Sequence, residues 1–396
     1  MNSEFSQWLG KRLVERQQAG LERKVSTLES NQSAQVICAG KQLINFSSND
    51  YLSLASDPCT LAALNDGARK YGVGSGASHL ICGHSEAHEL LAQELADWTG
   101  REAVALFSSG YMANLAVLNT LTDKSDLLVQ DKLNHASLID SGLTAAASNL
   151  RYRHADMQSL QQQLAARDAR FKWIVSDGVF SMDGDVAPIT KMVDIATQHQ
   201  ALMMIDDAHG IGVLGANGAG LLEQYQVLPS QVTVLMGTLG KALGTAGAFV
   251  ASSQEVIDSL TQFGRSYIYT TAMSPAMAYA SYRNVRLCRE QPQRRQTLEQ
   301  SISLFKSMAQ ELGIAIMPSD TAIQPVLIHD DNACVEIGKW LRERGFWVGV
   351  IRPPTVPKGS ARLRVTLNSA HTQSQIEQLL LAIKDALMRF APQRLS

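Results

Sequence analysis

The sequence lacks the features that mark exported and nucleic-acid-binding proteins. Cysteine is scarce: the five residues in 396 are scattered, without the paired spacing of a zinc site or a disulfide framework. Positive charge is not in excess, because the formal net charge is -2, so no basic field attracts nucleic acid or anionic membrane. Charged residues such as Glu4, Lys11 and Arg12 interrupt the apolar run that a secretory signal requires. We therefore expect a cytoplasmic protein with no nucleic-acid, membrane or metal partner.

Long hydrophobic runs are also absent. The most apolar late segment, 232–252, is broken by Lys241 and by several glycines, which disfavours a membrane span. Hydrophobic residues nevertheless make up 45% of the chain, and 396 residues are enough for a large domain and a smaller one, each with its own core. A small-molecule substrate is the default expectation for such a protein.

Short apolar runs alternate with longer helical patterns from about residue 51 to residue 282. Each run ends in small or polar residues, which is typical of buried strands in a parallel α/β sheet. The clearest runs are Ala103–Phe107, Leu127–Gln130, Trp173–Ser176, Leu202–Ile205, Val232–Met236 and Ala248–Ala251. Because ligands bind at the carboxyl ends of strands in such sheets, the polar residues after these runs are the candidates for chemistry.

The two ends of the chain have different patterns. Residues 5–21 alternate apolar and charged positions at helical spacing, which predicts an arm helix that packs on another element. A long helical pattern covers residues 273–312, and three strand-like segments and a final amphipathic helix follow it. We predict three parts, listed in chain order: an N-terminal arm (1–50), a large α/β domain (51–283) and a small α+β domain (284–396).

Lys241 lies in a loop of small residues, Gly237–Gly244, directly after the apolar run 232–236. Glycines let a planar ligand approach the backbone, and a lysine there can carry its amine to a carbonyl or a phosphate. Desolvation would lower the pKa of this amine, as an imine-forming lysine requires. The spacing does not fit the Walker phosphate loop. Taken alone, the segment fits a solvated surface lysine equally well.

Two acids and an imidazole, Asp206, Asp207 and His209, follow the apolar run 202–205. Unpaired charge at the end of a buried strand is costly, so we expect partners for it. A carboxylate can hold the proton of a heterocyclic nitrogen, and His209 can hydrogen-bond a neighbouring oxygen. The alternatives are a helix N-cap and a metal site, and the absence of a further ligand at metal-binding spacing disfavours the metal.

Other strand ends offer weaker candidates. Residues 108–114 open a helical pattern, so their backbone N–H groups can bind a phosphate, although such turns are common. His135 could stack on a flat ring and Ser181 lies in an acidic turn, but each also fits a structural role. Arg352 precedes two prolines that stiffen its segment, which suits bidentate capture of a carboxylate; an ion-paired arginine before a rigid turn is the alternative.

Together these residues resemble the α-oxoamine synthase family of fold-type I pyridoxal-phosphate enzymes, over nearly the whole chain. The most specific stretches are Asn45–Leu52, Gly178–Gly184, Asp206–Gly210, Thr238–Lys241 and Ile351–Pro357. The resemblance implies a mainly parallel seven-stranded sheet flanked by helices, a smaller C-terminal α+β domain and an N-terminal helical arm. The chain departs from the usual family pattern at Ser78–Cys82 and Thr245–Gly247. The resemblance therefore predicts how the cofactor binds more closely than it predicts which substrates fit.

The resemblance also assigns roles by position. Lys241 would be the Schiff-base lysine, Asp206 the partner of the pyridine nitrogen, and His135 the residue that stacks on the ring and assists as an acid. The contacts of the ring hydroxyl would be His209 and Ser181. The phosphate contacts would be Gly110, Tyr111 and Thr238, with Thr270 or Thr271 from a second subunit. The substrate contacts would be His135, Arg352 for the amino-acid carboxylate, and Arg23 and Thr355 for the acyl group.

The stretch 351–357 resembles the branch of the family that serves biotin biosynthesis. This implies decarboxylative condensation of L-alanine with a pimeloyl thioester, carried by coenzyme A or acyl carrier protein, in a homodimer with its sites at the interface. Two alternatives stay open. One is a sister activity, such as a glycine-using 2-amino-3-oxobutyrate ligase or an autoinducer synthase. The other is a catalytically silent partner subunit, which the presence of Lys241 and Asp206 disfavours.

Overall fold

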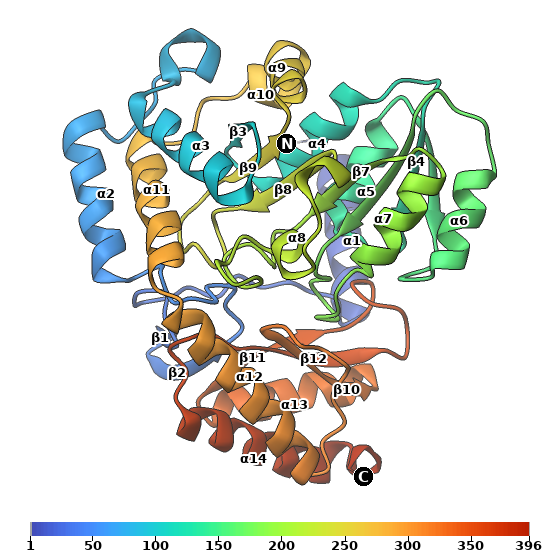
Figure 1. The fold of residues 1–396 in the computed structure, drawn as a ribbon. Coiled ribbons are helices and arrows are strands. Elements are labelled where there is room, and N and C mark those ends of the chain that lie inside the picture. The colour runs from blue at the N-terminus through green and yellow to red at the C-terminus, as the bar shows by residue number, and fades with distance from the viewer. Residues whose placement is uncertain (1, 396) are drawn as a thin grey trace.

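The computed structural model describes residues 2–395 and shows two sheets, each covered by helices (Figure 1). The larger sheet has seven strands in the order β3-β9-β8-β7-β6-β4-β5. Its strands are β3 (Ala103–Phe107), β4 (Leu127–Asp131), β5 (Ser148–Tyr152), β6 (Lys172–Asp177), β7 (Leu202–Asp206), β8 (Val234–Thr238) and β9 (Ala248–Ser252). Strands β4 to β8 are parallel, and β9 is antiparallel to both of its neighbours. The predicted mainly parallel α/β fold is confirmed.

Alternate residues of the central strands contribute to two hydrophobic cores, one on each face of the large sheet. Ile174 and Met203 belong to one core, whereas Val175 and Met204 belong to the other. This is why the strands read as continuous apolar runs in the sequence. The edge strand β5 contains exposed Arg151 between partly buried Leu150 and buried Tyr152, so its sequence shows no continuous apolar run.

Helices cover both faces of the large sheet (Figure 1). They are α2 (Pro58–Tyr71), α3 (Glu86–Thr99), α4 (Gly110–Leu121), α5 (Ala136–Thr144), α6 (Met157–Ala165), α7 (Ile189–Gln198), α8 (Leu221–Gln224), α9 (Gln254–Phe263), α10 (Arg265–Ile268) and α11 (Pro275–Glu290). Helix α11 packs against α2 and α3. A Cβ atom at Gly67 of α2 would lie 2.9 Å from Cβ of Tyr279 of α11, so glycine permits this close approach.

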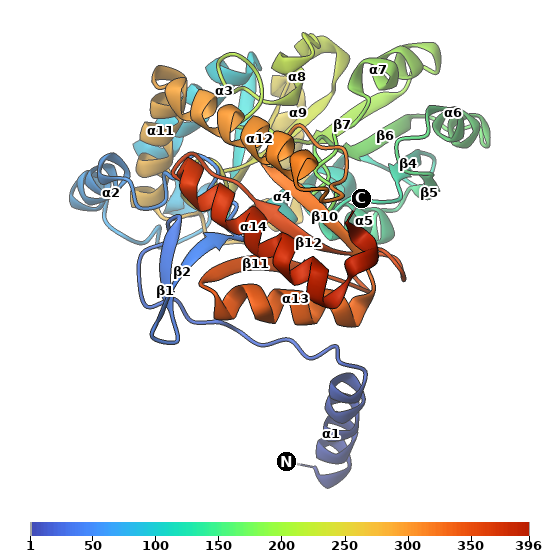
Figure 2. The same cartoon turned by 90° about the horizontal axis from the view of Figure 1, so that it is seen from below.

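The smaller sheet has five strands in the order β1-β2-β11-β12-β10. Its strands are β1 (Gln35–Cys38), β2 (Lys41–Phe46), β10 (Ile323–His329), β11 (Phe346–Ile351) and β12 (Ala361–Thr366). Helices α12 (Gln293–Glu311), α13 (Asp331–Glu343) and α14 (Gln373–Phe390) cover it (Figure 2). The long helical pattern predicted at 273–312 is two helices, because Pro292 lacks the N–H group that a continuous helix would need.

The three parts proposed from the sequence are placed as follows. Residues 35–46 of the proposed arm form β1 and β2, and β2 pairs in parallel with β11 of the smaller sheet. The proposed limit at residue 283 lies inside α11, which leads from the large sheet toward the small one. The three-part division stays a proposal.

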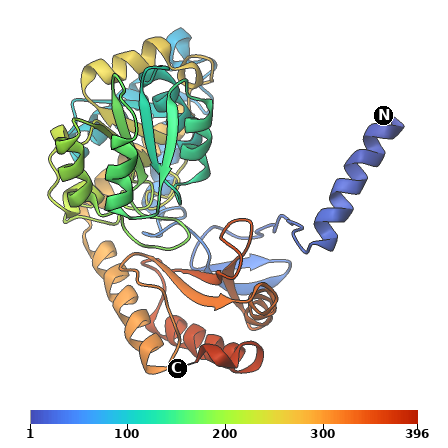
Figure 3. The same cartoon turned by 90° about the vertical axis from the view of Figure 1, so that its right-hand side faces the viewer.

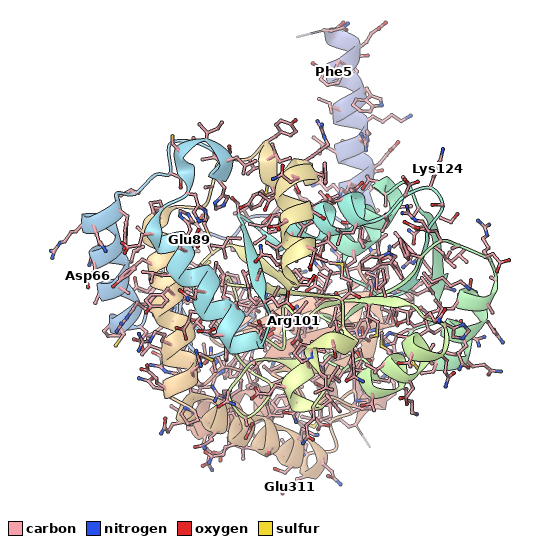
Figure 4. All side chains as sticks on the ribbon, turned by 45° about the horizontal axis from the view of Figure 1, so that its top comes forward. Phe5, Asp66, Glu89, Arg101, Lys124 and Glu311 are labelled. Carbon is pink, nitrogen blue, oxygen red and sulfur yellow. The ribbon has the colours of Figure 1, made fainter. Side chains whose placement is uncertain are left out.

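Helix α1 (Ser3–Gln18) projects away from both sheets (Figure 3). None of its residues is buried, and Phe5, labelled in Figure 4, lies far from the body of the protein. The predicted arm helix is therefore present, but within residues 2–395 its side chains are not buried against another element. Among these residues, none of the helices combines the length and the apolar character needed to cross a bilayer.

Candidate active site

The carboxyl ends of the large sheet's strands surround a cavity of about 180 Å³. Its lining residues come from the ends of β3, β4, β6, β7 and β8 and from the loops that follow them. They are Gly110, Tyr111, His135, Ser137, Asp177, Ser181, Asp206, Ala208, His209, Met236, Thr238 and Lys241. The structure thus brings eight of the predicted site residues into one cavity.

Lys241 enters the cavity from the loop after β8. That loop folds back on itself, because N–H of Leu239 donates to the carbonyl of Gly247 at 2.9 Å and the Thr238 hydroxyl donates to the same carbonyl at 3.0 Å. Burial lowers the pKa of Lys241 to about 8, although the carboxylates of Asp206 and Asp177 act in the opposite direction. About a tenth of the lysine is therefore the neutral, nucleophilic amine near pH 7.

Asp206 ends β7 and is 5% exposed. Its Oδ2 accepts a hydrogen bond from Nδ2 of Asn114 at 2.8 Å, and its Oδ1 accepts one from N–H of Ala208 at 3.1 Å. These bonds hold both oxygens of the carboxyl group at a fixed position. Sequence reasoning gave Asn114 no role; a polar residue among the apolar ones in the first turns of α4 was the available signal.

A second acid, Asp177, ends β6 beside Asp206 and was also missed. Its Oδ2 accepts a hydrogen bond from N–H of His135 at 2.7 Å. Burial, reinforced by the charge of Asp206, raises the pKa of Asp177 well above its ordinary value. His135 caps the N-terminus of α5 through Nδ1, which accepts from N–H of Ser137 at 3.2 Å.

His209 and Ser181 line the same cavity as Lys241. Nδ1 of His209 lies 2.6 Å from the Tyr51 hydroxyl, and burial together with the Lys241 charge lowers the pKa of His209 well below its ordinary value. The backbone carbonyl of Ser181 accepts a hydrogen bond from Nε of Arg364 at 2.6 Å. Arg364 lies on β12 of the smaller sheet, so both sheets contribute to this part of the site.

The N-terminus of α4 borders another part of the cavity. Ser109 caps this helix, and a Cβ atom at Gly110 would lie 3.2 Å from Cε of Met236, so a larger residue would be crowded there. The Tyr111 hydroxyl donates to a carboxylate oxygen of Asp140, which fixes the ring at the cavity edge. Free N–H groups at a helix N-terminus bind anions such as phosphate.

Five predicted residues do not line this cavity. Thr270 and Thr271 border a separate small hollow, where the Ser108 hydroxyl donates to the carbonyl of Thr271 at 3.3 Å. Arg352 follows β11, and its guanidinium has no hydrogen-bond or ion-pair partner among residues 2–395. Thr355, in the same turn, and Arg23, in the segment after α1, are exposed.

Arg364, which is 7% exposed, is a further residue that the sequence did not reveal. Besides the Ser181 carbonyl, it donates to the Thr366 hydroxyl at 2.9 Å and to Oδ1 of Asn49 at 3.1 Å. Its charge also lowers the pKa of Lys241, which shows that it lies close to the reactive amine. The alternation of arginine with apolar residues in β12 gave no sign of this role.

Comparison with known proteins shows the family. The model for aminotransferases of class I and II matches residues 41–383. An 8-amino-7-oxononanoate synthase of Marinomonas sp. is 50% identical over 382 residues, which are 96% of this chain and 94% of that one. One of Thioalkalivibrio sulfidiphilus is 49% identical over 378 residues, 95% and 96% of the two chains. The chain belongs to the 8-amino-7-oxononanoate synthase family.

Solved structures agree with this family and its fold type. The 8-amino-7-oxononanoate synthase from Francisella tularensis superposes with a TM-score of 0.77 at 30% identity, over 87% of this chain and 98% of that one. Sphingomonas wittichii serine palmitoyltransferase superposes with a TM-score of 0.92 at 28% identity, over 98% of both chains. The predictions of a fold-type I transferase, of a pyridoxal-phosphate-dependent acyltransferase and of this synthase activity are confirmed.

The cavity fits pyridoxal phosphate. It combines an amine of lowered pKa, a carboxylate held by Asn114, and a helix N-terminus at which a glycine leaves the backbone accessible. These are the three groups needed for an aldehyde, a protonated ring nitrogen and a phosphate. Among residues 2–395, histidines, cysteines and acids form no group of three or more that could hold a metal ion.

Proposed function

We propose that the chain binds pyridoxal phosphate in this cavity and joins L-alanine to a pimeloyl thioester with loss of carbon dioxide. The observation that carries the proposal is that Lys241 and Asp206 line one cavity at the carboxyl ends of β7 and β8. The identity of about 50% to 8-amino-7-oxononanoate synthases supports the choice of substrates. The thioester carrier is coenzyme A or acyl carrier protein.

The proposed cofactor contacts follow the geometry of the cavity. Asp206 would hold the protonated ring nitrogen, and the start of α4 at Gly110 and Tyr111 would hold the phosphate together with Thr238. His209 and Ser181 would contact the ring hydroxyl, and His135 would lie against the ring. When bound, pyridoxal phosphate supplies an aldehyde that reacts with amines and a cationic ring that accepts electrons from the neighbouring carbon.

Lys241 is proposed to move the proton in the reaction. Because its pKa is about 8, its Nζ can hold a proton or release it near neutral pH, which suits removal of the α-proton of alanine and its later return. His135 is proposed to assist as an acid at the acyl carbonyl. His135 lines the cavity and is exposed, so an acyl thioester can reach it from solvent.

Arg352 is proposed to bind the carboxylate of alanine. Its guanidinium is uncommitted, since it has no hydrogen-bond or ion-pair partner among residues 2–395, so its donors are available for bidentate capture. Arg364 already donates three hydrogen bonds to protein groups, which favours a structural task for it. Arg23 and Thr355 are proposed to contact the acyl group; both are exposed.

A homodimer is proposed for the assembled enzyme. Helix α1 carries exposed Phe5, Trp8 and Leu13, and a projecting apolar surface of this kind needs a partner to cover it. A second copy would supply one, and would also let Thr270 or Thr271 approach a phosphate site that they do not line within one chain. Sedimentation equilibrium should give twice the chain mass, and a monomer at micromolar concentration would refute the assembly.

A cytoplasmic location is also proposed. All five cysteines are free in the structure, and Cys59 and Cys82 are exposed. Free exposed thiols persist in a reducing compartment, where disulfides are rare. Fractionation of cells that make the native protein would test this location.

A substrate panel tests the proposed reaction. The purified holoenzyme is assayed with alanine or glycine, each with pimeloyl and acetyl thioesters, and with the pimeloyl group on coenzyme A or on acyl carrier protein. We expect turnover with alanine and a pimeloyl thioester, measured by release of the thiol and of carbon dioxide. Preference for glycine with the acetyl thioester would show that the chain has a sister activity of the family. Absence of turnover with every pair would show that the chain is a catalytically silent subunit.

A further inference from the structure

Three histidines, His79, His84 and His88, lie together where the stretch 78–82 departs from the usual family pattern. Their ring centroids are 5.0 to 5.2 Å from one another. The His79 ring also stacks on Tyr267 of α10, with centroids 5.0 Å apart and an angle of 2° between the planes. This histidine cluster lies outside the cofactor cavity, so the proposed reaction gives it no role.

The pair formed by His79 and His84 can hold only one charge. Nδ1 of His79 faces Nδ1 of His84 at 2.7 Å, and a single hydrogen fits between two nitrogens at this distance. The two rings therefore cannot both be cationic in this arrangement. Nε2 of His84 lies 2.8 Å from Oε1 of Glu89 of α3, labelled in Figure 4, which gives His84 the carboxylate partner of the pair. It follows that His79 is the ring that has to stay neutral.

His88 is fully buried and is bonded through both ring nitrogens. The backbone N–H of Ser85 donates to Nδ1 at 3.0 Å, so Nδ1 carries a lone pair. Nε2 lies 2.8 Å from the carbonyl oxygen of Met273, which is an acceptor alone, so Nε2 carries the hydrogen. A second proton, on Nδ1, would oppose the N–H of Ser85. His88 therefore fits the structure as a neutral ring.

Residues 270–273 are bonded to the histidine cluster and to the chain just before it. The N–H of Ala272 donates to the carbonyl of Ala77 at 3.0 Å, and the His88 ring donates to the carbonyl of Met273. Since these bonds come from both ends of the stretch that contains the three rings, a rearrangement of the rings would free the segment 270–273.

This segment contains the two threonines that the proposed homodimer brings to the cofactor phosphate. Thr271 forms an antiparallel bridge with Ser78, next to the first histidine of the cluster. Thr270 and Thr271 also border the same small hollow as His79 and Tyr267. The arrangement of the histidine cluster therefore determines where these threonines lie.

Burial lowers the pKa of His79 to about 3, and the charges of His88 and His84 act in the same direction. Burial also lowers the pKa of His88, although Glu89 opposes this shift. Among residues 2–395, the other ionisable groups in contact with the three rings are Glu89 and Tyr267. A released histidine has the ordinary pKa of 6.5. The packed cluster is thus fully stable above about pH 6.5 and is progressively lost as the pH falls toward about 3.

We propose that His79, His84 and His88 are positioning residues that hold the segment 270–273 while His79 and His88 are neutral, and that acidification releases the segment and weakens cofactor binding. The effect on the cofactor rests on the proposed function, because it requires Thr270 or Thr271 to reach the phosphate in a second subunit. The release of the segment does not depend on that function.

Amide hydrogen exchange tests the release directly. The N–H of Ala272 is the reporter, because its bond to the Ala77 carbonyl has to break before it exchanges. Mass spectrometry of the full chain, with and without pyridoxal phosphate, gives the protection of the peptide that contains Ala272 after correction for the chemical exchange rate at each pH. We expect a fall of roughly tenfold from about pH 7.5 to about pH 5.5, as uptake of a proton by one released histidine requires. Constant protection over this range would overturn the proposal.

The variant His79→Phe tests the cause of the release. It keeps a flat ring beside Tyr267 but cannot take up a proton, so we expect its protection to change with pH by about tenfold less than that of wild type. His199→Gln, at the C-terminal end of α7, should keep the wild-type response. An equal fall in His79→Phe would overturn the role of His79, and the wild-type series still decides the release if this variant fails to fold.

The link to the cofactor has a separate readout, the dissociation constant of pyridoxal phosphate measured across the same pH range. We expect this constant to rise more steeply on acidification in wild type than in His79→Phe. The comparison cancels the titration of Lys241, which both proteins share. Equal pH dependence in the two proteins would contradict the link between the segment and the cofactor. Failure of the wild-type protein to bind pyridoxal phosphate at any pH would instead refute the proposed function and leave the exchange result standing.

Discussion

The amide of Asn114 holds the carboxylate of Asp206, with Nδ2 2.8 Å from Oδ2. Asn114 is fully buried, and the same amide nitrogen also donates to the Ser137 hydroxyl at 2.8 Å. The carboxylate that would pair with the cofactor's ring nitrogen is therefore oriented by helix α4, whose N-terminus would bind the phosphate at the other end of the same molecule. One helix would thus position both ends of the cofactor.

Replacing Asn114 by Leu should weaken cofactor binding. A hydrogen bond to a charged group contributes about 1.5–3 kcal/mol, which corresponds to roughly a tenfold to hundredfold rise in the dissociation constant. Titration of the protein freed of cofactor with pyridoxal phosphate measures this constant. Asn119→Leu, on the same helix but with an exposed amide, is the control. An unchanged constant in the Asn114 variant would contradict the role given to this residue.

The reaction of Lys241 with pyridoxal phosphate should depend on pH with a midpoint of about 8. The neutral amine attacks the aldehyde, so the rate constant should rise as the pH rises through this value. Asp206→Asn removes a carboxylate that raises the pKa of Lys241, so the midpoint should move to lower pH. Stopped-flow absorbance measures both. A midpoint at the ordinary lysine value would argue against the buried, reactive amine.

His154 should make stability depend on pH. Burial alone would lower the pKa of His154, but hydrogen bonds to Asp131 (3.0 Å) and Asp185 (2.8 Å) outweigh it and raise the pKa to about 10. The folded protein then binds more protons than the unfolded chain between the unfolded value, about 6.5, and about 10. This stabilisation is complete below about pH 6.5 and is lost as the pH rises through about 10.

The variant His154→Gln tests this linkage. Thermal unfolding should show a lower melting temperature than wild type near pH 6, and the difference should shrink as the pH approaches 10. His199→Gln, at the C-terminal end of α7, is the matched control, because His199 has no carboxylate partner in the described part of the chain, 2–395. A difference that stays constant over this pH range would show that the two ion pairs do not supply the stability of the wild-type protein.

The roles of Arg352 and Arg364 can be distinguished with a substrate analogue that lacks a carboxylate. Wild type should bind L-alanine more tightly than L-alaninamide, and Arg352→Met should lose this preference by roughly tenfold or more, as expected for loss of a charge-assisted pair. Spectral titration of the holoenzyme measures both constants. Arg364→Met should keep the preference, although it disturbs the contacts with Ser181 and Asn49. Loss of the preference in Arg364→Met alone would show that Arg364, and not Arg352, binds the carboxylate of alanine.

The sequence predicted the large sheet and most of the cavity because both depend on local patterns. Buried strands such as β7 appear as unbroken apolar runs, and the polar residues after them, such as Asp206 and His209, meet at one edge of the sheet for topological reasons. The edge strand β5 has mixed exposure and gave no such run.

The residues that the sequence did not reveal act across long separations. Arg364 reaches Asn49 over 315 positions and Ser181 over 183, and Asn114 reaches Asp206 over 92. A local pattern contains no information on such partners, because they are set by how β12 and α4 are placed relative to the strands of the large sheet. The projection of α1 was likewise not predicted, since an amphipathic pattern indicates that a helix needs a partner without saying which one.

The most direct test of the account is to identify the residue that carries the cofactor. The protein is incubated with pyridoxal phosphate and reduced with borohydride, and peptide mass spectrometry then locates the pyridoxyl group. We expect a single labelled site at Lys241, with loss of both label and visible absorbance in Lys241→Ala. Labelling at another lysine, or a Lys241→Ala protein that keeps its colour and its turnover, would contradict the pairing of Lys241 with Asp206 on which the account depends.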